Sequence, residues 1–178
     1  MTVAVRSTEA ADRAAVLVVV RDAFTNGGRD GTEEVAIVSD TWSLGAEIDG
    51  LDLVAVDGAE VVGHVLSARA ELGGREVAAI APLAVAPAWH GRGVGTGLMT
   101  EVLRRADAAR RPLVALLGDP GYYGRFGFEP SGPLGITYPL VGADNPHFLV
   151  RKLTHYDPSY RGDVVYCWEA AAPRAPDR

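Results

Sequence analysis

Three glycines at alternate positions mark the segment of this sequence that could bind an anion. Gly91, Gly93 and Gly95 come shortly after the apolar stretch 83–85. Because glycine lacks a Cβ atom, the backbone amides of such a turn can point outward. Apolar residues then recur every four positions from Val94, which predicts an amphipathic helix. Free amides beside the positive end of a helix dipole favour phosphate, so we expect a phosphorylated cofactor at this turn.

The glycine spacing departs from two common phosphate-binding loops. The last position of the dinucleotide fingerprint G-x-G-x-x-G would fall on Thr96 or Leu98, and no Gly-Lys-Ser/Thr follows for a nucleoside-triphosphate loop. The segment resembles instead the Q/R-x-x-G-x-G/A loop of the GNAT superfamily, the N-acyltransferases that use acyl-coenzyme A (CoA). His90 stands where that family usually has Gln or Arg, and a neutral histidine still donates one hydrogen bond. The alternative interpretation is a tight strand-to-helix turn without a ligand.

A second motif, at 118–130, reads G-D-P-G-Y-Y-G-R-F-G-F-E-P. It resembles the Y-x-x-x-G-F helix and strand of the GNAT family, and above all a bacterial branch of N-acetyltransferases with G-D-P-x-Y-Y-x-R-F-G-F. The resemblance extends from the first strand to about Trp168. It implies an α+β, three-layer GNAT fold with a mixed, mostly antiparallel sheet of six to seven strands. Helices would cover both faces, and the fourth and fifth strands would be splayed apart.

The resemblance implies acetyl-CoA as co-substrate, without a metal ion. Pro82 predicts a bulge at Ala81-Pro82, because proline cannot donate to a neighbouring strand. In the family this splay admits the pantetheine arm, which would contact the main chain of Leu83 and Val85. The residues that we expect to contact the cofactor are Leu83, Ala84, Val85, His90, Gly91, Arg92, Gly93, Val94, Gly95, Thr96, Tyr122 and Arg125.

Acetyl transfer to an amine requires a base, oxyanion stabilisation and a proton donor for the departing sulfur. Tyr123 occupies the tyrosine of Y-x-x-x-G-F, which implies that it is the general acid, and a phenol of pKa about 10 can donate a proton. Packing or a pantetheine contact is the alternative role for Tyr123, and Tyr122 could exchange roles with it. We assign the oxyanion to a backbone amide within 83–85, since no side chain there can donate.

The general base is less evident. Many relatives carry a carboxylate on the strand at 78–85, and this chain has none there. His64 is our candidate because histidine titrates near neutral pH. Glu71, Glu76 and Asp119 are alternatives, and each of the four could instead be structural. A water chain or capture of a neutral amine would also serve.

Composition restricts the possible functions. The 178 residues suit one domain, expected over 1–169 with a flexible tail at 170–178. A formal net charge of −6 argues against nucleic-acid binding and is compatible with a cationic amine. The single Cys167 excludes an internal disulfide and is expected to be a buried structural thiol in a strand. The apolar run at 14–20 is too short to span a membrane, so we expect no membrane association and a cytoplasmic location.

Hydrophobic periodicity and turn signals predict the remaining elements. We expect strands at 2–6, 51–56, 60–72, 75–85, 112–117, 148–153 and 163–168. We expect helices at 8–24, where Thr8 with Glu9 and Asp12 would form the start, and at 29–41 and 94–110. Asp119 as N-cap and Pro120 at the first position would open a short fourth helix, and a long loop would follow at 130–146. In the family the first two helices shape the acceptor pocket, although they could equally be a cover over one sheet edge.

The prediction is an N-acetyltransferase that acts on a primary amine of a small molecule or peptide. The alternatives are an acyl-CoA-binding module without activity and an acyltransferase for longer acyl groups. The acceptor and a homodimeric state are left open by the sequence. Aromatic or imidazole side chains that could line the acceptor pocket, or simply pack, are Trp42, Tyr138, His147 and Tyr160.

Overall fold

A computed structural model describes residues 3–26, 28–142 and 144–171 of the chain. The α-helices are α1 (Arg13–Phe24), α2 (Thr32–Ser43), α3 (Val94–Ala108), α4 (Pro120–Tyr123) and α5 (Cys167–Ala171). The long strands are β1 (Ala4–Ser7), β4 (Glu47–Asp57), β5 (Glu60–Leu72), β6 (Arg75–Val85), β7 (Leu113–Leu117), β10 (Phe148–Lys152) and β11 (Gly162–Tyr166). The two-residue strands are β2 (Thr25–Asn26), β3 (Arg29–Asp30), β8 (Glu129–Pro130) and β9 (Ile136–Thr137).

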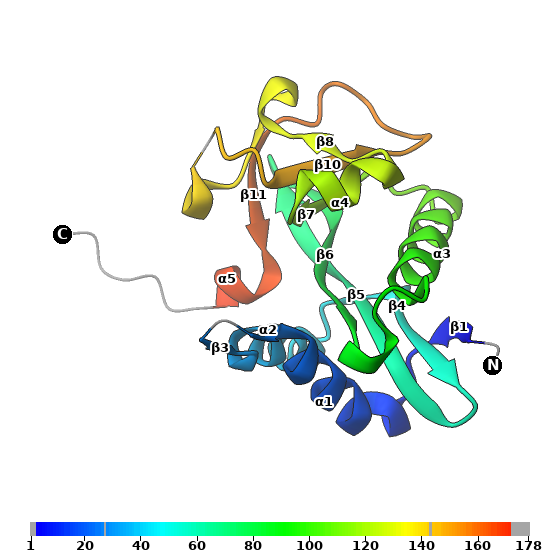
Figure 1. The fold of residues 1–178 in the computed structure, drawn as a ribbon. Coiled ribbons are helices and arrows are strands. Elements are labelled where there is room, and N and C mark those ends of the chain that lie inside the picture. The colour runs from blue at the N-terminus through cyan, green and yellow to red at the C-terminus, as the bar shows by residue number, and fades with distance from the viewer. Residues whose placement is uncertain (1–2, 27, 143, 172–178) are drawn as a thin grey trace.

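The main sheet confirms the expected α+β architecture (Figure 1). Its strand order is β1-β4-β5-β6-β7-β10-β8, and β11 pairs with the far end of β5 while β9 pairs with β11. Neighbours are antiparallel except β6–β7 and β9–β11. A strand–helix–strand unit, β6–α3–β7, makes the parallel pair, as such crossovers require. The helices therefore connect and cover one curved sheet.

Helices pack against both faces of the sheet through buried apolar side chains. Leu98 and Met99 of α3 are fully buried on one face, together with Leu53 of β4. On the other face Val16 and Val20 of α1 pack with β4 and β5. Burial of one such side chain stabilises the fold by about 1.5–3 kcal/mol. These two layers fix the positions from which the loops at the sheet edge project.

The bulge expected at Ala81-Pro82 is confirmed, and β6 diverges from β7 beyond it. Leu83 pairs with Val65 of β5, whereas Ile80 pairs with Ser67, so β6 carries one additional residue between them. The peptide bond between Ala81 and Pro82 is cis. The parallel pairing of β6 with β7 is limited to Ala78 with Val114 and Ala79 with Ala115. The part of β6 beyond Ala79 is therefore not paired with β7, as expected for the fourth and fifth strands.

The start of the first helix differs from the expectation. A short 3₁₀ turn, Ala10–Asp12, precedes α1, and the carboxylate of Asp12 accepts a hydrogen bond from the Glu9 amide at 2.8 Å. Thr8 is no cap, because its hydroxyl donates to Asp52 of β4 at 2.6 Å. A long-range hydrogen bond thus replaces the local cap that the sequence predicts. The first strand, expected at 2–6, is Ala4–Ser7, and residues 1–2 lie outside the described residues.

The second predicted helix begins three residues later than expected. Arg29 and Asp30 pair with β2 as a small hairpin, and α2 follows from Thr32. Gly31 has φ +69°, and a Cβ atom there would lie 2.5 Å from the Arg21 carbonyl oxygen, so only glycine fits between the hairpin and α1. The Asp30 carboxylate accepts from the Thr32 amide at 3.0 Å. Helix α2 thereby starts at a sharp turn against α1.

The C-terminal third contains more regular structure than expected. The predicted loop at 130–146 includes β9 and two 3₁₀ turns, Gly132–Leu134 and Pro139–Val141. The last strand ends at Tyr166, and Cys167 and Trp168 begin α5 rather than continuing the strand. Of the predicted tail, residues 170–171 belong to α5, and 172–178 lie outside the described residues.

Candidate active site

The glycine-rich turn forms one wall of a cleft with a volume of about 550 Å³, which we call the loop cleft. Residues from the end of α1, from β6 and from α4 complete it. Ten of the expected cofactor contacts line it: Leu83, Val85, His90, Gly91, Gly93, Val94, Gly95, Thr96, Tyr122 and Arg125. The other two expected contacts, Ala84 and Arg92, do not line the cleft. Three residues that the sequence did not indicate also line it: Ala23, Phe24 and Trp89. Phe24 was missed because only the tertiary fold brings the end of α1 to β6.

The geometry of the turn leaves amides without partners. Gly91 and Gly93 have φ +72° and +81°, and Gly93 is the N-cap residue of α3. No side chain caps this helix, so its first amides have no acceptor within the helix. A Cβ atom at Gly95 would lie 2.8 Å from the phenol oxygen of Tyr122. Glycine therefore keeps open the space between the helix N-terminus and Tyr122.

The polar side chains around the loop cleft are held in place by local contacts. His90 Nε2 lies 2.9 Å from the Val85 carbonyl oxygen, which ties the turn to the end of β6. Arg125 donates from Nε to the Tyr122 carbonyl oxygen at 2.9 Å, and its guanidinium lies 4.7 Å from the centre of the Tyr122 ring. Arg92 lies over Trp89 instead, 5.2 Å from the ring centre. The cleft thus combines free amides with the cation of Arg125.

A second cleft of about 750 Å³ opens where β6 separates from β7, and we call it the splay cleft. Its sheet wall consists of residues from the ends of β6 and β7 and from α4, including Pro82, Leu116 and Tyr123. Its helix wall consists of residues from α2, from the end of β11 and from α5, and of the segment around Tyr138. Leu83 and Phe24 line both clefts, so the two clefts meet at the bulged part of β6.

Tyr123 lies in the sheet wall of the splay cleft, held by α4. As expected, Asp119 is the N-cap of α4, where its carboxylate accepts from the Gly121 amide at 2.9 Å. The Tyr123 ring packs edge-on against Phe128 and Tyr122, with ring centres 5.9 and 4.9 Å apart. Burial raises the pKa of Tyr123 to about 12, so its phenol is protonated at neutral pH. Tyr122 lines the loop cleft instead, so the two neighbouring tyrosines line different clefts.

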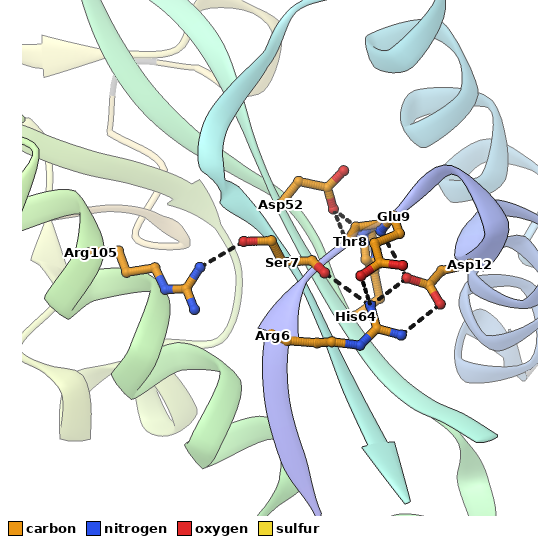
Figure 2. A network of polar contacts seen from close by, with 8 residues as sticks. All are labelled: Arg6, Ser7, Thr8, Glu9, Asp12, Asp52, His64 and Arg105. Atoms are coloured by element: carbon orange, nitrogen blue, oxygen red, sulfur yellow. Dashed lines mark hydrogen bonds and ion pairs between the residues drawn. The ribbon is translucent and has the colours of Figure 1, made fainter. Parts of the chain in front are cut away.

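His64 lies on the face of the sheet that α1 and α2 cover, and it lines neither cleft. Its side chain has 0% exposure, and its Nε2 lies 2.7 Å from an oxygen of Asp52. Thr8 and Trp42 donate to the same carboxylate at 2.6 and 2.8 Å. Figure 2 shows how Thr8 and His64 converge on Asp52 beside the Arg6–Asp12 ion pair. His64 is thus buried in a hydrogen-bonded network with Asp52, away from both clefts, and its position suits a structural role.

Replacement of Asp52 by Asn is expected to lower the free energy of unfolding by about 1–3 kcal/mol at neutral pH. Burial alone would raise the pKa of Asp52, but the hydrogen bonds from His64, Thr8 and Trp42 outweigh it, so the pKa lies below its usual value. A lowered carboxyl pKa stabilises the fold above the pKa of the unfolded chain, about 3.9, and this contribution is lost as the pH falls through the folded-state pKa. The difference between wild type and Asp52→Asn should therefore shrink in acid.

Urea unfolding between neutral pH and the acid transition measures this difference. Asp49→Asn is the matched control, because Asp49 is an exposed carboxylate on the same strand. Equal stability of Asp52→Asn and Asp49→Asn at neutral pH would contradict the role given to the buried network.

The other residues that the sequence suggested as the base or as acceptor contacts do not lie together. Asp119 lines the splay cleft, whereas Glu76 forms ion pairs with Arg69 and Arg111 outside it, and Glu71 lines neither cleft. Tyr138 lines the splay cleft, and Trp42, His147 and Tyr160 do not. Across residues 3–26, 28–142 and 144–171, no cluster of three or more His, Cys, Asp and Glu side chains could hold a metal ion. Within the same ranges, no helix is long and apolar enough to cross a membrane.

Comparison with known proteins identifies the family. The model of the acetyltransferase (GNAT) domain matches residues 4–131. The chain belongs to the GNAT family. The uncharacterized N-acetyltransferase YjhQ of Escherichia coli is 31% identical over 121 residues, which cover 64% of this chain and 67% of YjhQ. The uncharacterized N-acetyltransferase YhbS of the same organism is 37% identical over 82 residues, which cover 44% of this chain and about half (49%) of YhbS.

Solved GNAT structures share the whole fold. The crystal structure of Escherichia coli YhbS in complex with CoA superposes with a TM-score of 0.84 at 26% identity, over 96% of this chain and 92% of that one. A GNAT acetyltransferase from Brucella melitensis in complex with acetyl-CoA gives a TM-score of 0.74 at 28% identity, over 93% of this chain and 96% of that one. This GNAT domain therefore resembles proteins that were crystallised with CoA or acetyl-CoA.

Proposed function

We propose that this GNAT protein transfers an acetyl group from acetyl-CoA to a primary amine of a small molecule or peptide. One observation carries the proposal: two clefts meet at Leu83, with free helix amides in one and the buried phenol of Tyr123 in the other. Such an arrangement suits a donor that is anchored by its phosphates on one side and reacts at its far end on the other. Two similar structures were crystallised with CoA or acetyl-CoA, which supports CoA as the carrier of the donor group.

The loop cleft fits the pyrophosphate of CoA. The first amides of α3 lack acceptors, the helix dipole is positive at this end, and Arg125 adds a full positive charge. The pantetheine arm would then follow β6, whose main chain beyond Ala79 is not paired with β7. A backbone amide within 83–85 would stabilise the oxyanion, as no side chain on this segment can donate.

Tyr123 would supply the proton that the departing sulfur needs. In the reaction the amine nitrogen forms a bond to the acetyl carbonyl carbon, the carbon–sulfur bond breaks, and sulfur leaves with the electron pair. Because its pKa is about 12, Tyr123 holds its proton until a strong acceptor develops, and its phenolate must regain a proton at once. The nitrogen becomes acidic as it acquires the acetyl group, so the proton that it loses can restore the phenol.

The amine must lose its first proton before it attacks, because an ammonium has no free electron pair. Among the four residues considered as base, only Asp119 lines the cleft of Tyr123, and its carboxylate already caps α4. His64, the candidate base from the sequence, has no exposed surface and cannot take a proton from an amine in the cleft. Capture of the neutral amine from solvent, or a water molecule beside Asp119, would meet this requirement.

Two measurements on the purified protein test the proposal. Titration calorimetry with acetyl-CoA should show saturable binding, and CoA thiol release should depend on the presence of an amine acceptor. Binding without amine-dependent release, over a panel of amines, would support the module without activity and contradict the enzyme. Faster release of CoA from longer acyl-CoA donors than from acetyl-CoA would show that the transferred group is a longer acyl group. No binding of acetyl-CoA or CoA would refute the proposal altogether.

A further inference from the structure

We propose that the acceptor carries a second cationic group, which the helix wall of the splay cleft binds while the reacting amine lies beside Tyr123. This inference rests on the proposed function and specifies its substrate class: diamines, polyamines and other amines with an additional ammonium or guanidinium group. It follows from the distribution of charge within the cleft, from one buried carboxylate oxygen and from the aromatic residues beside it.

The lining of the splay cleft is strongly acidic. Five carboxylates line it, against the single guanidinium of Arg29. Four of the five belong to the helix wall, on α2 and α5, and they are Glu33, Glu34, Asp40 and Glu169. Asp119 on the opposite wall is already engaged as the cap of α4. The charge excess is therefore concentrated away from Tyr123.

Glu34 provides the specific contact. The residue is only 8% exposed, and one of its carboxylate oxygens, Oε1, forms an ion pair with Arg29. The other oxygen, Oε2, is buried and has no hydrogen-bond partner among the described residues. A buried carboxylate oxygen without a donor is costly. Rotation of the Glu34 carboxylate toward the cleft would let this oxygen accept a hydrogen bond from a cationic N–H group of a ligand.

Aromatic side chains complete the helix wall. Tyr138, Tyr166 and Trp168 line the cleft, and the Tyr138 phenol donates a hydrogen bond to Glu169. The rings of Tyr166 and Trp168 are stacked, with centres 4.6 Å apart. Aromatic faces attract ammonium and guanidinium groups, and this attraction increases where water is excluded. Carboxylates and aromatic rings on one wall thus favour a cation over a neutral or anionic group.

The opposite wall has the properties that the reacting amine requires. Around Tyr123 it is formed by apolar residues, including Pro82, Leu83 and Leu116. An apolar environment disfavours an ammonium and favours the neutral amine that can attack, whereas the acidic wall keeps a second group charged. An acceptor with two nitrogen groups would match both walls at once, and a monoamine would be drawn to the acidic wall in its unreactive form.

The test compares cationic acceptors with monoamines of matched chain length on the full-length protein. Putrescine, cadaverine and spermidine are measured against butylamine and pentylamine, with CoA release at saturating acetyl-CoA and with calorimetry on the CoA-bound protein. We expect kcat/KM for the best cationic acceptor to exceed that of its matched monoamine by about tenfold or more, the effect of one charged hydrogen bond. Glu34→Gln and Asp40→Asn should each reduce this preference about three- to tenfold.

Glu60→Gln is the matched control, because it removes one exposed carboxylate at the start of β5, outside both clefts, and should keep the full preference. Equal kcat/KM for diamines and monoamines, with amine-dependent release intact, would overturn the inference and leave the proposed function standing. If neither Glu34→Gln nor Asp40→Asn reduces the preference for cationic acceptors, the inference is overturned as well. If Glu34→Gln does not fold, the result for Asp40→Asn decides the inference. If no amine is acetylated, the proposed function fails, and calorimetry with cadaverine against pentylamine decides the inference.

Discussion

Replacement of Tyr123 by Phe is expected to lower kcat by about ten- to a thousand-fold while the Kd of acetyl-CoA changes little. The phenol oxygen is removed, but the ring that packs against Phe128 and Tyr122 is retained. Sulfur would then have to leave without a positioned proton donor. Steady-state kinetics with a true acceptor and calorimetry with acetyl-CoA measure the two quantities separately.

Two variants provide controls for this prediction. Tyr156→Phe removes a phenol outside both clefts and should retain wild-type turnover. Gly118→Ala leaves the Tyr123 phenol intact but places a Cβ atom closer to its ring than van der Waals contact allows, so the ring must shift and kcat should also fall. Wild-type turnover of Tyr123→Phe with a true acceptor would remove Tyr123 from the mechanism.

Replacement of Gly95 by Ala is expected to weaken acetyl-CoA binding by about tenfold or more, the equivalent of about 1.4 kcal/mol. The new methyl group would lie 2.8 Å from the Tyr122 phenol oxygen and 3.5 Å from a Val85 methyl group, in the space that the pyrophosphate and the start of the pantetheine arm would occupy. The Tyr122 ring must move, and the first turn of α3 becomes less accessible. Calorimetric titration with acetyl-CoA measures the change.

Gly97→Ala is the matched control on the same helix. Its methyl group would meet only Val5, at an ordinary distance of 3.9 Å, and alanine within a helix stabilises it by about 0.5–1 kcal/mol relative to glycine. This variant should bind acetyl-CoA like the wild type and unfold at a slightly higher temperature. Equal affinities of Gly95→Ala and Gly97→Ala for acetyl-CoA would exclude the loop cleft as the phosphate site.

Local rules predicted those parts of the site that depend on only a few neighbouring residues. The alternate glycines before Val94 indicated the helix N-terminus with free amides, and Asp119 followed by Pro120 indicated the cap of α4. Pro82 indicated the bulge of β6. In each case the physical cause, a positive φ, a capping carboxylate or a missing donor, acts within one turn or one strand pair.

The same rules failed where distant contacts decide the structure. Thr8 has the right type for a helix cap, yet its hydroxyl binds Asp52 on another strand. Cys167 continues an alternating pattern, yet α5 begins there, where Glu169 accepts hydrogen bonds from Tyr138 and from the Tyr166 amide. In both cases a residue far away in the sequence, Asp52 or Tyr138, forms a hydrogen bond that the local pattern does not indicate.

The sequence by itself determined the family and the strand–turn–helix at 83–108, because contiguous residues specify these features. It also indicated the phosphate site and the proton donor that we propose, for the same reason. Only the tertiary structure decided that His64 is enclosed beneath α1 and α2 and that Glu34 and Glu169, from opposite ends of the chain, line one cleft. The reason is that side chains meet across a cleft through the order and curvature of the whole sheet, which no short segment specifies.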